Sequence, residues 1–288
     1  MTVETVIASK SWTCPAYVSS VSVECWGAGA GGATAVGATA GGGGGGGAYS
    51  VKAVTVIPGR QYRANIGAVG ATGVAGGDTS FLAVDGTTEV MAKGGGAPSG
   101  ATGGTGGASG SGVGTTKRAG GNGANGVTTT GGGGGGSATS AAAGNNGSGA
   151  TGGTGEAQGG TGGANTIVGL VGADPGAGGG GGGGGDTAGG AGGLGKITLT
   201  YTVSAIKETD ELIVRAEAGR FVEAFRGNDF IASKGSNDVL DSNISSGKVL
   251  IGAIDGLGAR IRAASTVQTA QIAGLTRAYI EGLITIVG

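Results

Sequence analysis

The sequence predicts a mainly β protein, and two observations lead to this fold class. Glycine occupies 76 of the 288 positions, about 26% of the chain against an average usage near 7%, so ordinary compact enzyme architecture is not expected. The other residues of the first two thirds gather in short runs rich in Val, Ile, Thr and aromatics, bounded by Gly or Pro, as β-strands are. We expect a small β-sandwich, jelly-roll-like, with long glycine-rich loops, followed by a smaller C-terminal β or α+β domain.

The composition divides the chain near Ser204. Residues 1–204 contain 66 glycines and 16 charged residues, whereas residues 205–288 contain 10 glycines and 19 charged residues. We expect the first region to be a glycine-rich sandwich domain and the second to be a domain for attachment or oligomerisation. The glycine tracts inserted in the first domain span residues 27–47, 94–136 and 144–195.

Six runs of the first domain predict strands. In the first of them, Val21, Val23 and Cys25 lie on one face and Trp26 on the other, as a half-buried strand requires. The six runs are residues 18–26, 49–57, 61–66, 80–84, 90–93 and 196–203.

The conformation of the glycine tracts is open between two alternatives. Glycine loses the most backbone entropy on ordering, so flexible or irregular loops are the default. Against that default, glycines recur three apart, and three residues make one turn of a polyproline-II helix, so neighbouring strands of this type could approach closely and hydrogen-bond through their backbones. The rows are Gly100, Gly103 and Gly106; Gly104, Gly107 and Gly110; and Gly149, Gly152 and Gly155.

The composition excludes several classes of function. The chain has no histidine, which removes His-based triads, His metal sites and His pH switches. No nucleophile-and-base pair, carboxylate pair or metal cluster can be assembled, so we predict no enzyme activity, no cofactor and no metal. The formal charge is −1 without a Lys/Arg stripe, so nucleic acid is not an expected partner.

Membrane insertion is not expected either, because no run approaches the ~20 apolar residues that cross a bilayer. No secretion signal is recognisable at the N-terminus, so we expect synthesis in a cytoplasm.

Two glycine-rich motifs nearly match nucleotide sites. Residues 27–32 satisfy G-x-G-x-x-G after a strand, but the following residues, with seven glycines from Gly41, cannot sustain the required helix at a cost of ~1 kcal/mol per glycine. Residues 190–196 have the spacing of a phosphate-binding loop, yet Ile197 stands where a hydroxyl should bind Mg²⁺. Neither motif predicts nucleotide binding.

The few large side chains of the first domain are expected to be its framework. Cys14 and Cys25 lie eleven apart on successive strands, so a disulfide is geometrically allowed, although reduced thiols packed as small hydrophobes are the commoner state. The expected framework residues are Trp12, Cys14, Cys25, Trp26, Tyr49, Tyr62, Phe81 and Tyr201.

Several blocks of these residues resemble one known family. The opening block, Ser-Trp-Thr-Cys-Pro-Ala at residues 11–16 and Val-Glu-Cys-Trp-Gly-Ala-Gly at 23–29, is similar to the start of the glycine-rich domain of tail and fibre (minor tail) proteins of tailed bacteriophages. The resemblance covers roughly residues 1–204. Further matching blocks lie at residues 47–52, 58–59, 76–81, 92–95 and 195–201.

This resemblance implies a virion structural protein, in a tail fibre or at the tail tip, that displays glycine-rich loops for attachment to the host surface. The implied partners are other virion proteins, further copies of the chain as a trimer or higher homo-oligomer, and a host glycan or protein. The implied location is the virion, after synthesis in the host cytoplasm. The resemblance supplies no receptor-binding residues, because the matching positions are framework.

A second class of function is an extracellular glycine-rich binding or matrix module, similar to an ice-binding protein built on polyproline-II strands. Repeated threonines, Thr102, Thr105 and residues 128–130, would form its binding face. The lack of a secretion signal and the long C-terminal region count against it.

The last 84 residues lie outside the resemblance. Residues 212–214, 220–232 and 248–254 predict strands, while helix and strand are equally favoured over residues 265–287, where a capping box at Ser265 to Gln268 is followed by interrupting glycines. The apolar end of this segment is expected to contact a partner or to form a small core. Its contact residues would be Leu275, Tyr279, Leu283 and Ile286.

Overall fold

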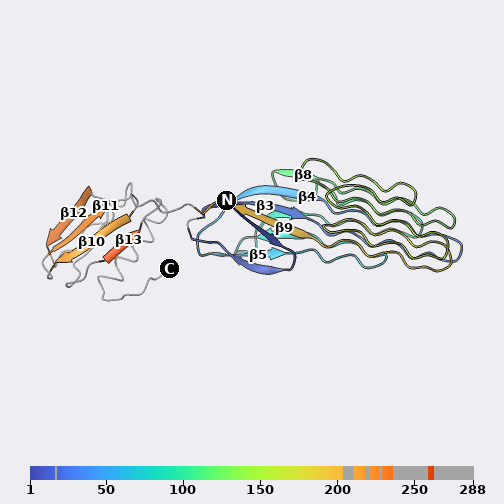
Figure 1. Ribbon diagram of the computed structural model, residues 1–288, viewed down its shortest axis with the longest axis horizontal. Coiled ribbons are helices and arrows are strands. Elements are labelled where there is room, and N and C mark those ends of the chain that lie inside the picture. Colours follow the sequence, from blue (N-terminus) through green and yellow to red (C-terminus); the bar gives the residue numbers. More distant parts are fainter. Residues whose placement is uncertain (17, 204–210, 218–220, 227–228, 236–258, 263–288) are drawn as a thin grey trace. The chain divides into compact units, whose positions relative to one another are not determined.

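The computed structural model describes residues 1–16 and 18–203 in full and, beyond them, the backbone of four strands. The chain divides into two compact units, Met1–Val203 and Ser204–Gly288. The first unit contains two antiparallel sheets and, extending from one end of them, a bundle of glycine-rich segments (Figure 1). No α-helix occurs in the described residues, so the mainly β prediction is confirmed.

Nine strands make up the two sheets of the first unit. One sheet has the strand order β1-β9-β3-β4-β8 and the other β2-β5-β6-β7, with every neighbouring pair antiparallel. The strands are β1 Thr2–Val6, β2 Lys10–Thr13, β3 Ser20–Trp26, β4 Tyr49–Thr55, β5 Gln61–Asn65, β6 Thr79–Leu82, β7 Thr88–Ala92, β8 Thr116–Arg118 and β9 Lys196–Tyr201.

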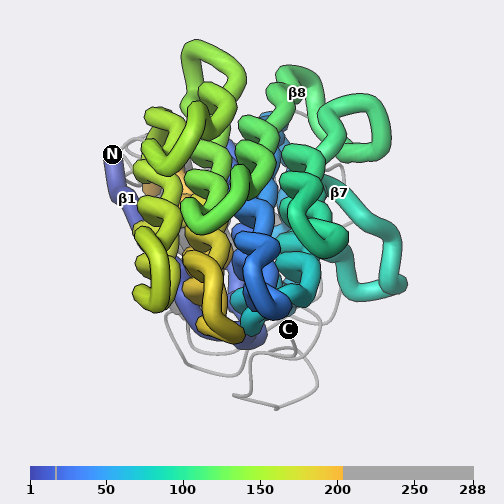
Figure 2. The backbone as a smooth tube through the Cα atoms, turned by 90° about the vertical axis from the view of Figure 1, so that its right-hand side faces the viewer, coloured from blue at the N-terminus to red at the C-terminus, as the bar shows by residue number. Residues whose placement is uncertain are grey.

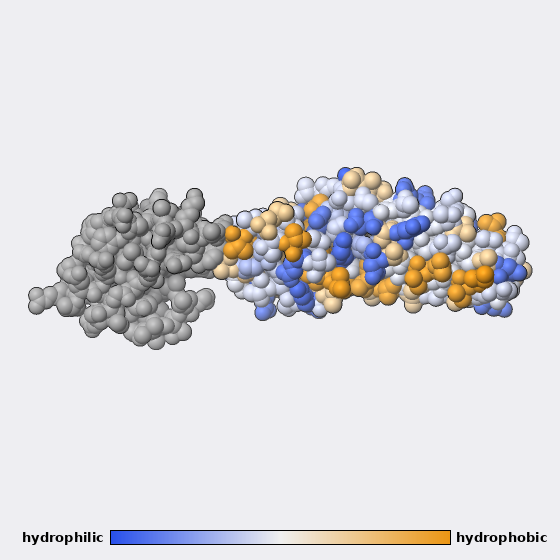
Figure 3. Space-filling model, viewed as in Figure 1, coloured by the Kyte–Doolittle hydropathy of each residue, from blue (hydrophilic) through white to orange (hydrophobic). Residues whose placement is uncertain are grey.

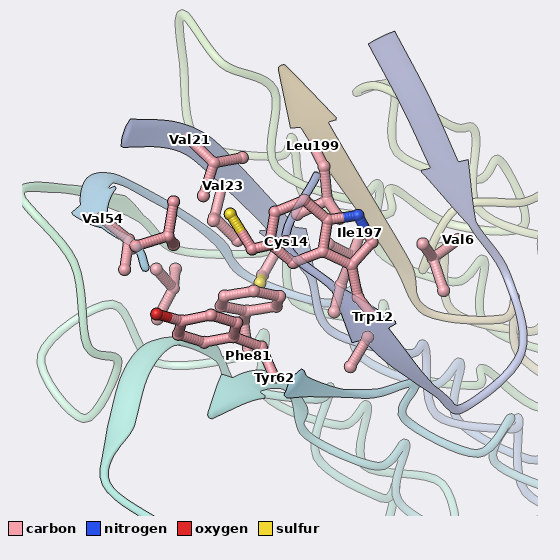
Figure 4. Close-up of a cluster of buried hydrophobic side chains, with 14 of the residues drawn as sticks. Val6, Trp12, Cys14, Val21, Val23, Val54, Tyr62, Phe81, Ile197 and Leu199 are labelled. Atoms are coloured by element: carbon pink, nitrogen blue, oxygen red, sulfur yellow. The ribbon is translucent and has the colours of Figure 1, made fainter. Parts of the chain in front are cut away.

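A single aromatic-centred core lies between the two sheets (Figure 4). Val21, Val23 and Cys25 of β3 are buried in it, as their alternation predicts. From the other sheet, the rings of Tyr62 and Phe81 stack with centroids 5.5 Å apart. These apolar contacts hold the two sheets of the sandwich together.

A second, smaller cluster joins the sheet to the bundle. Trp26 and Tyr49 lie on the opposite face of the first sheet, with ring centroids 4.9 Å apart, and pack against Ala138. The Trp26 indole Nε1 donates a hydrogen bond to the Ala138 carbonyl at 3.0 Å, and the Lys196 ammonium lies 4.0 Å from the indole centroid. The large framework side chains are therefore divided between two clusters, because Trp26 at the end of β3 faces away from Val21, Val23 and Cys25.

Three strands carry little signal in the sequence and were not predicted. β1 and β2 are short, and most of their side chains are exposed. β8 has three residues that pair with the edge of β4. Short edge strands lack the alternation of a half-buried strand, so their pairing depends on the neighbour that the fold supplies.

The glycine tracts form an ordered, hydrogen-bonded bundle and not flexible loops (Figure 2). In segment 27–35, the N–H groups of residues 27, 30 and 33 donate to segment 42–48, those of 28 and 31 to segment 74–77, and those of 29, 32 and 35 to segment 187–193. Successive residues thus face three different neighbours, and the pattern repeats every three residues. This is the period of a polyproline-II helix.

The interior segments have neighbours on all sides. Segment 40–48 donates its N–H groups to segments 93–100, 121–128 and 176–182, and its carbonyls accept from segments 27–33, 104–107 and 132–138. Residues 40–48 are all buried. A buried backbone without side chains can be satisfied only in this way, because every polar group needs a partner.

Glycine is required in the interior because the neighbouring backbone occupies the place of a side chain. A Cβ built on Gly44 would lie 2.2 Å from the Ala30 carbonyl oxygen, and one built on Gly45 would lie 1.9 Å from the Thr105 carbonyl oxygen. No rotamer relieves this overlap, since Cβ is fixed by the backbone.

The described strands of the C-terminal unit form a separate sheet of order β12-β11-β10-β13. Residues 220–232 were predicted as one strand. They contain the whole of β11, Phe221–Arg226, and the start of β12, Asp229–Gly235, and these two strands pair antiparallel. The sequence between them, Gly227-Asn228, is a turn signal that the strand prediction overlooked. The remaining strands are β10 Glu211–Glu217 and β13 Ala259–Arg262, and the predicted strand at residues 248–254 lies outside the described residues.

We predict that Gly45→Ala lowers the stability of the first unit by about 3 kcal/mol or more, since overpacking against rigid backbone is costly. The substitution places a methyl group on the Thr105 carbonyl oxygen and must separate two segments. Gly110→Ala is the matched control, because a Cβ built there meets nothing within 4 Å. Urea unfolding of the two variants measures the difference, and equal midpoints would show that the interior tolerates side chains.

We also predict that Cys14 and Cys25 resist thiol reagents in the native protein. Both are free and buried, so no disulfide links them. Burial raises the pKa of the Cys14 thiol to about 11 and raises that of Cys25 further, which leaves little reactive thiolate at pH 8. Labelling with a maleimide should be slow in buffer and complete in denaturant.

The same pKa shifts predict how stability depends on pH. The unfolded thiols ionise near pH ~8.5, whereas the folded ones stay protonated above it, so the free energy of unfolding should fall as the pH rises past that value. A double Cys14→Ala, Cys25→Ala variant removes this part of the pH dependence and is the control. Rapid native labelling at pH 8 would contradict the assignment of both thiols to a closed core.

Candidate binding surface at the tip of the glycine-rich bundle

The glycine-rich segments are joined by tight turns at the far end of the bundle (Figure 2). In three turns the residue at the second position is glycine with φ between 53° and 57°, as a left-handed backbone favours: Gly37, Gly100 and Gly149. In the turn at residues 127–130 the corresponding residue is Thr128, with φ 49°. The far end therefore differs from the interior in carrying side chains.

Four of these turns are hydrogen-bonded to one another and are here called the tip cluster: residues 36–39, 127–130, 164–167 and 183–187. The Gly37 N–H donates to a carboxylate oxygen of Asp186 at 2.8 Å, and the Gly185 N–H donates to the Gly37 carbonyl at 2.6 Å. Further bonds run from Ala40 N–H to Thr128, from Gly184 N–H to Thr129, and from Thr166 N–H to Gly184. The turns therefore form one connected surface.

The tip cluster presents apolar and hydroxyl side chains with a single carboxylate. Val36, Val127 and Ile167 are exposed at 72%, 60% and 55%. Thr128 and Thr166 are also exposed, and Asp186 is the only charged residue in the four turns. Such a surface offers van der Waals contact and hydroxyl hydrogen bonds, and it lacks the charge for recognising an anionic ligand.

Backbone strain is concentrated at this tip. Thr128, Thr166 and Asp186 have φ of 49°, 60° and 59°, and they are the non-glycine residues with positive φ in the described part of the chain. A β-branched residue in this region is a steric outlier that costs ~1–3 kcal/mol where glycine would cost little. The tip is therefore the part of the described chain where side chains are carried in spite of an unfavourable backbone conformation.

One side of the bundle is polar and uncharged. Thr102 and Thr105 are exposed three residues apart on the first of its segments. Asn122 and Asn125 follow on the neighbouring segment, where their side-chain carbonyls accept hydrogen bonds from Gly106 N–H and Gly103 N–H. The asparagine side chains thus accept hydrogen bonds that the backbone carbonyls of a further segment would otherwise accept. They leave fewer unpaired N–H groups at this edge of the bundle. The sequence alone did not reveal this role.

The threonines proposed for a matrix or ice-binding module do not form one row. Thr102 and Thr105 lie along the polar side, whereas residues 128–130 belong to a turn of the tip cluster. The structure brings the two groups onto neighbouring hairpins, since Gly126 N–H donates to the Ala101 carbonyl.

The motifs considered for metal and nucleotide binding can be located in the described residues. No cluster of three or more His, Cys, Asp or Glu side chains that could hold a metal ion occurs among them. Residues 27–32, which match the dinucleotide motif, are an interior segment whose N–H groups are all bonded to other segments. The described part of the chain also contains no helix long and apolar enough to span a membrane.

The expected framework residues lie away from the tip. Trp12, Cys14, Cys25, Tyr62 and Phe81 are buried in the core between the sheets, and Tyr201 packs against it partly exposed. Trp26 and Tyr49 form the second cluster, at the base of the bundle. The contact residues expected near the C-terminus, Leu275, Tyr279, Leu283 and Ile286, lie outside the described residues.

The tip residues were missed because nothing in their local sequence separates them from the tracts around them. A repeated turn pattern, Gly-Ala-Thr at residues 37–39, 100–102 and 149–151, was available, but of these turns only the one at residues 37–39 belongs to the tip cluster. A tripeptide recurring where glycine runs are interrupted marks the turns between segments, and the side chains beside it mark the surface.

Comparison with known proteins gives one result for this chain. Residues 4–202 match a family model described as a glycine-rich domain. The match spans both sheets and the whole bundle of the first unit. No curated protein sequence matches the chain.

Proposed function

The chain belongs to the glycine-rich domain family, and from the architecture of this domain we propose that it is a virion structural protein of a tailed bacteriophage, a tail fibre or tail-tip component that attaches to the host surface. The observation that carries the proposal is the strained, side-chain-bearing tip cluster at the end of a bundle whose interior is almost entirely backbone. The likeness of the opening blocks to phage tail proteins supports the choice of particle.

The tip cluster is suited to contact with a large partner. Its apolar side chains, Val36, Val127 and Ile167, come from three turns tied together by backbone hydrogen bonds. A surface held in this way loses little conformational entropy on binding. Contacts from many copies on one particle would then add through avidity, so each can be weak.

The chemistry of the tip favours a neutral partner surface. No Lys or Arg occurs in the four turns, so an acidic glycan finds no counter-charge there. No aromatic residue is available for stacking on a sugar ring. A host protein or a neutral glycan met through hydroxyl and apolar contacts fits these groups.

The finer features expected of the fold belong to the same proposal. These are a jelly-roll-like connection of the two sheets, polyproline-II geometry of the bundle segments, and a C-terminal domain that attaches the chain to other virion proteins. The three-residue period of the hydrogen bonds supports the second of them.

The proposal predicts that Val127→Asp in particles of the phage that encodes the chain reduces adsorption to host cells at least tenfold while leaving particle assembly unchanged. A carboxylate at this exposed position would have to be desolvated on contact. Val84→Asp is the matched control, since Val84 is exposed to a similar degree, 62%, in the loop between β6 and β7 at the other end of the unit. Adsorption kinetics measure the effect, and the idea fails if the chain is not in the particle or if both variants adsorb alike.

Thr128→Gly is predicted to separate binding from stability. Glycine relieves the strain at φ 49°, so the melting temperature should not fall, yet adsorption should decrease because the threonine side chain is lost from the tip. Gly100→Ala is a useful counterpart, because it introduces strain at φ 56° in a turn outside the tip cluster. Gly100→Ala should lower the melting temperature and leave adsorption unchanged. If instead Thr128→Gly adsorbs like the unchanged particle, the threonine side chain has no part in binding and the prediction is wrong.

A further inference from the structure

We propose that the side of the bundle formed by segments 66–75, 187–194 and 167–173 is an interface between two copies of this chain. This side is here called the apolar face. Its three segments are direct neighbours: the Gly169 N–H donates to the Ala188 carbonyl at 3.0 Å, and the Gly192 N–H donates to the Gly70 carbonyl at 2.9 Å. The inference does not depend on the proposed function.

Large apolar side chains are exposed on both outer segments of the face. Val168 and Val171, three apart on one segment, are exposed at 55% and 67%, and Val69 and Val74, before and at the end of the turn at residues 71–74, are exposed at 43% and 53%. Figure 3 shows hydrophobic residues gathered along the lower side of this unit, with more polar residues above them. Contiguous exposed patches of this kind mark sites of association.

The three segments contain no charged residue. The nearest acidic residues in the sequence, Asp174 and Asp186, follow one segment and precede another. A face of this composition can meet a copy of itself without like-charge repulsion, whereas it offers nothing to pair with a charged partner.

The relief of the face is complementary to itself. The middle segment presents Ala188 and Ala191, three residues apart, between outer segments that present larger side chains such as Val168 and Val171, also three apart. A two-fold axis parallel to the segments, and midway between the middle segment and the segment that carries Val168 and Val171, would place the taller row of each copy against the row of small side chains of the other. The periods agree because both copies have the same three-residue repeat, about 9 Å long.

Another glycine segment cannot cover this face. The N–H groups of Val168, Val171, Ala188 and Ala191 have no hydrogen-bond partner within the described residues, so they could in principle receive one more segment. Inside the bundle, however, a Cβ would lie about 2 Å from the neighbouring carbonyl oxygen, as at Gly44. The side chains at the face therefore exclude backbone pairing, and cover must come from side-chain contact.

The size of the face sets the expected strength of pairing. Seven extended residues span about 20 Å and three hydrogen-bonded segments about 15 Å, which gives roughly 300 Å² in projection. A standard stable interface buries about 800 Å² per partner. Two copies should therefore associate weakly through this face alone, and more tightly where other contacts already hold them close.

The test compares two pairs of substitutions in the full chain by sedimentation equilibrium up to millimolar concentration. Val168→Asp with Val171→Asp puts carboxylates on the apolar face, and Thr102→Asp with Thr105→Asp puts them at the same spacing on the polar side. All four side chains are exposed, so both variants should melt like the unchanged protein. We expect the first variant to self-associate at least tenfold more weakly and the second to match the unchanged chain.

A cross-linking measurement identifies the occupant of the face. Val171→Cys adds an exposed thiol to a unit whose own cysteines are buried, and mild oxidation should join two copies faster than it does for Thr105→Cys. Equal association of the two aspartate variants, or equal cross-linking at both positions, overturns the proposal. Two other results would also overturn the proposal and identify a different occupant. One is cross-linking of Val171→Cys to a different protein. The other is binding of the unchanged chain to lipid vesicles, if the Val168→Asp, Val171→Asp variant no longer binds them.

Discussion

The bundle depends on the close approach of one backbone to another, which only glycine permits. Where a side chain would begin, the carbonyl of a neighbouring segment already lies about 2 Å away, as at Gly45 beside Thr105. Cohesion therefore comes from hydrogen bonds between segments, each worth ~1 kcal/mol net, against the large entropy that glycine loses on ordering. These opposing contributions are of similar size. Such a bundle needs its chain ends fixed, and the sandwich supplies this: β3 leads into segment 27–35, and segment 40–48 returns into β4.

The same constraint decides which residues meet the outside. The longest glycine runs are interior, so most of the bare backbone is covered by other segments. Segment 40–48 is buried along its whole length, and each of its N–H groups is used by another segment. Side chains are admitted where a segment lacks a neighbour, namely on the outer rows and at the turns. The molecule thus has a polar side marked by Asn122, an opposite apolar face marked by Val171, and a tip marked by Thr128.

Sequence reasoning recovered the elements whose side chains carry a pattern. The alternation of Val21, Val23 and Cys25 gave the buried face of β3 correctly. The spacing of Gly103 and Gly106 correctly indicated that both face the same neighbour. A Cβ built on either glycine would meet the backbone of one segment, at residue 123 and residue 120 respectively. The third member of another row, Gly110, faces open space instead.

The identity of the neighbouring segments could not be predicted, because glycines are interchangeable and no side chain shows which segments belong together. The tip was hidden for a related reason, since it is assembled from turns as distant in sequence as residues 37 and 186.

A bundle built in this way separates its framework from its contact surface. A side chain added at Gly44 disrupts two segments at once, so the interior admits almost no change. A turn is closed by backbone groups, as where the Val36 and Thr39 N–H groups each donate to the other residue's carbonyl. Exposed side chains such as Val36 and Val127, which make none of these hydrogen bonds, can therefore be exchanged without altering the bonding of the bundle, whereas Asp186 accepts one from Gly37. Because the segments are thin and closely spaced, several turns meet in one small area. New combinations of these tip side chains can then arise at little structural cost, because the framework that holds the turns does not depend on them.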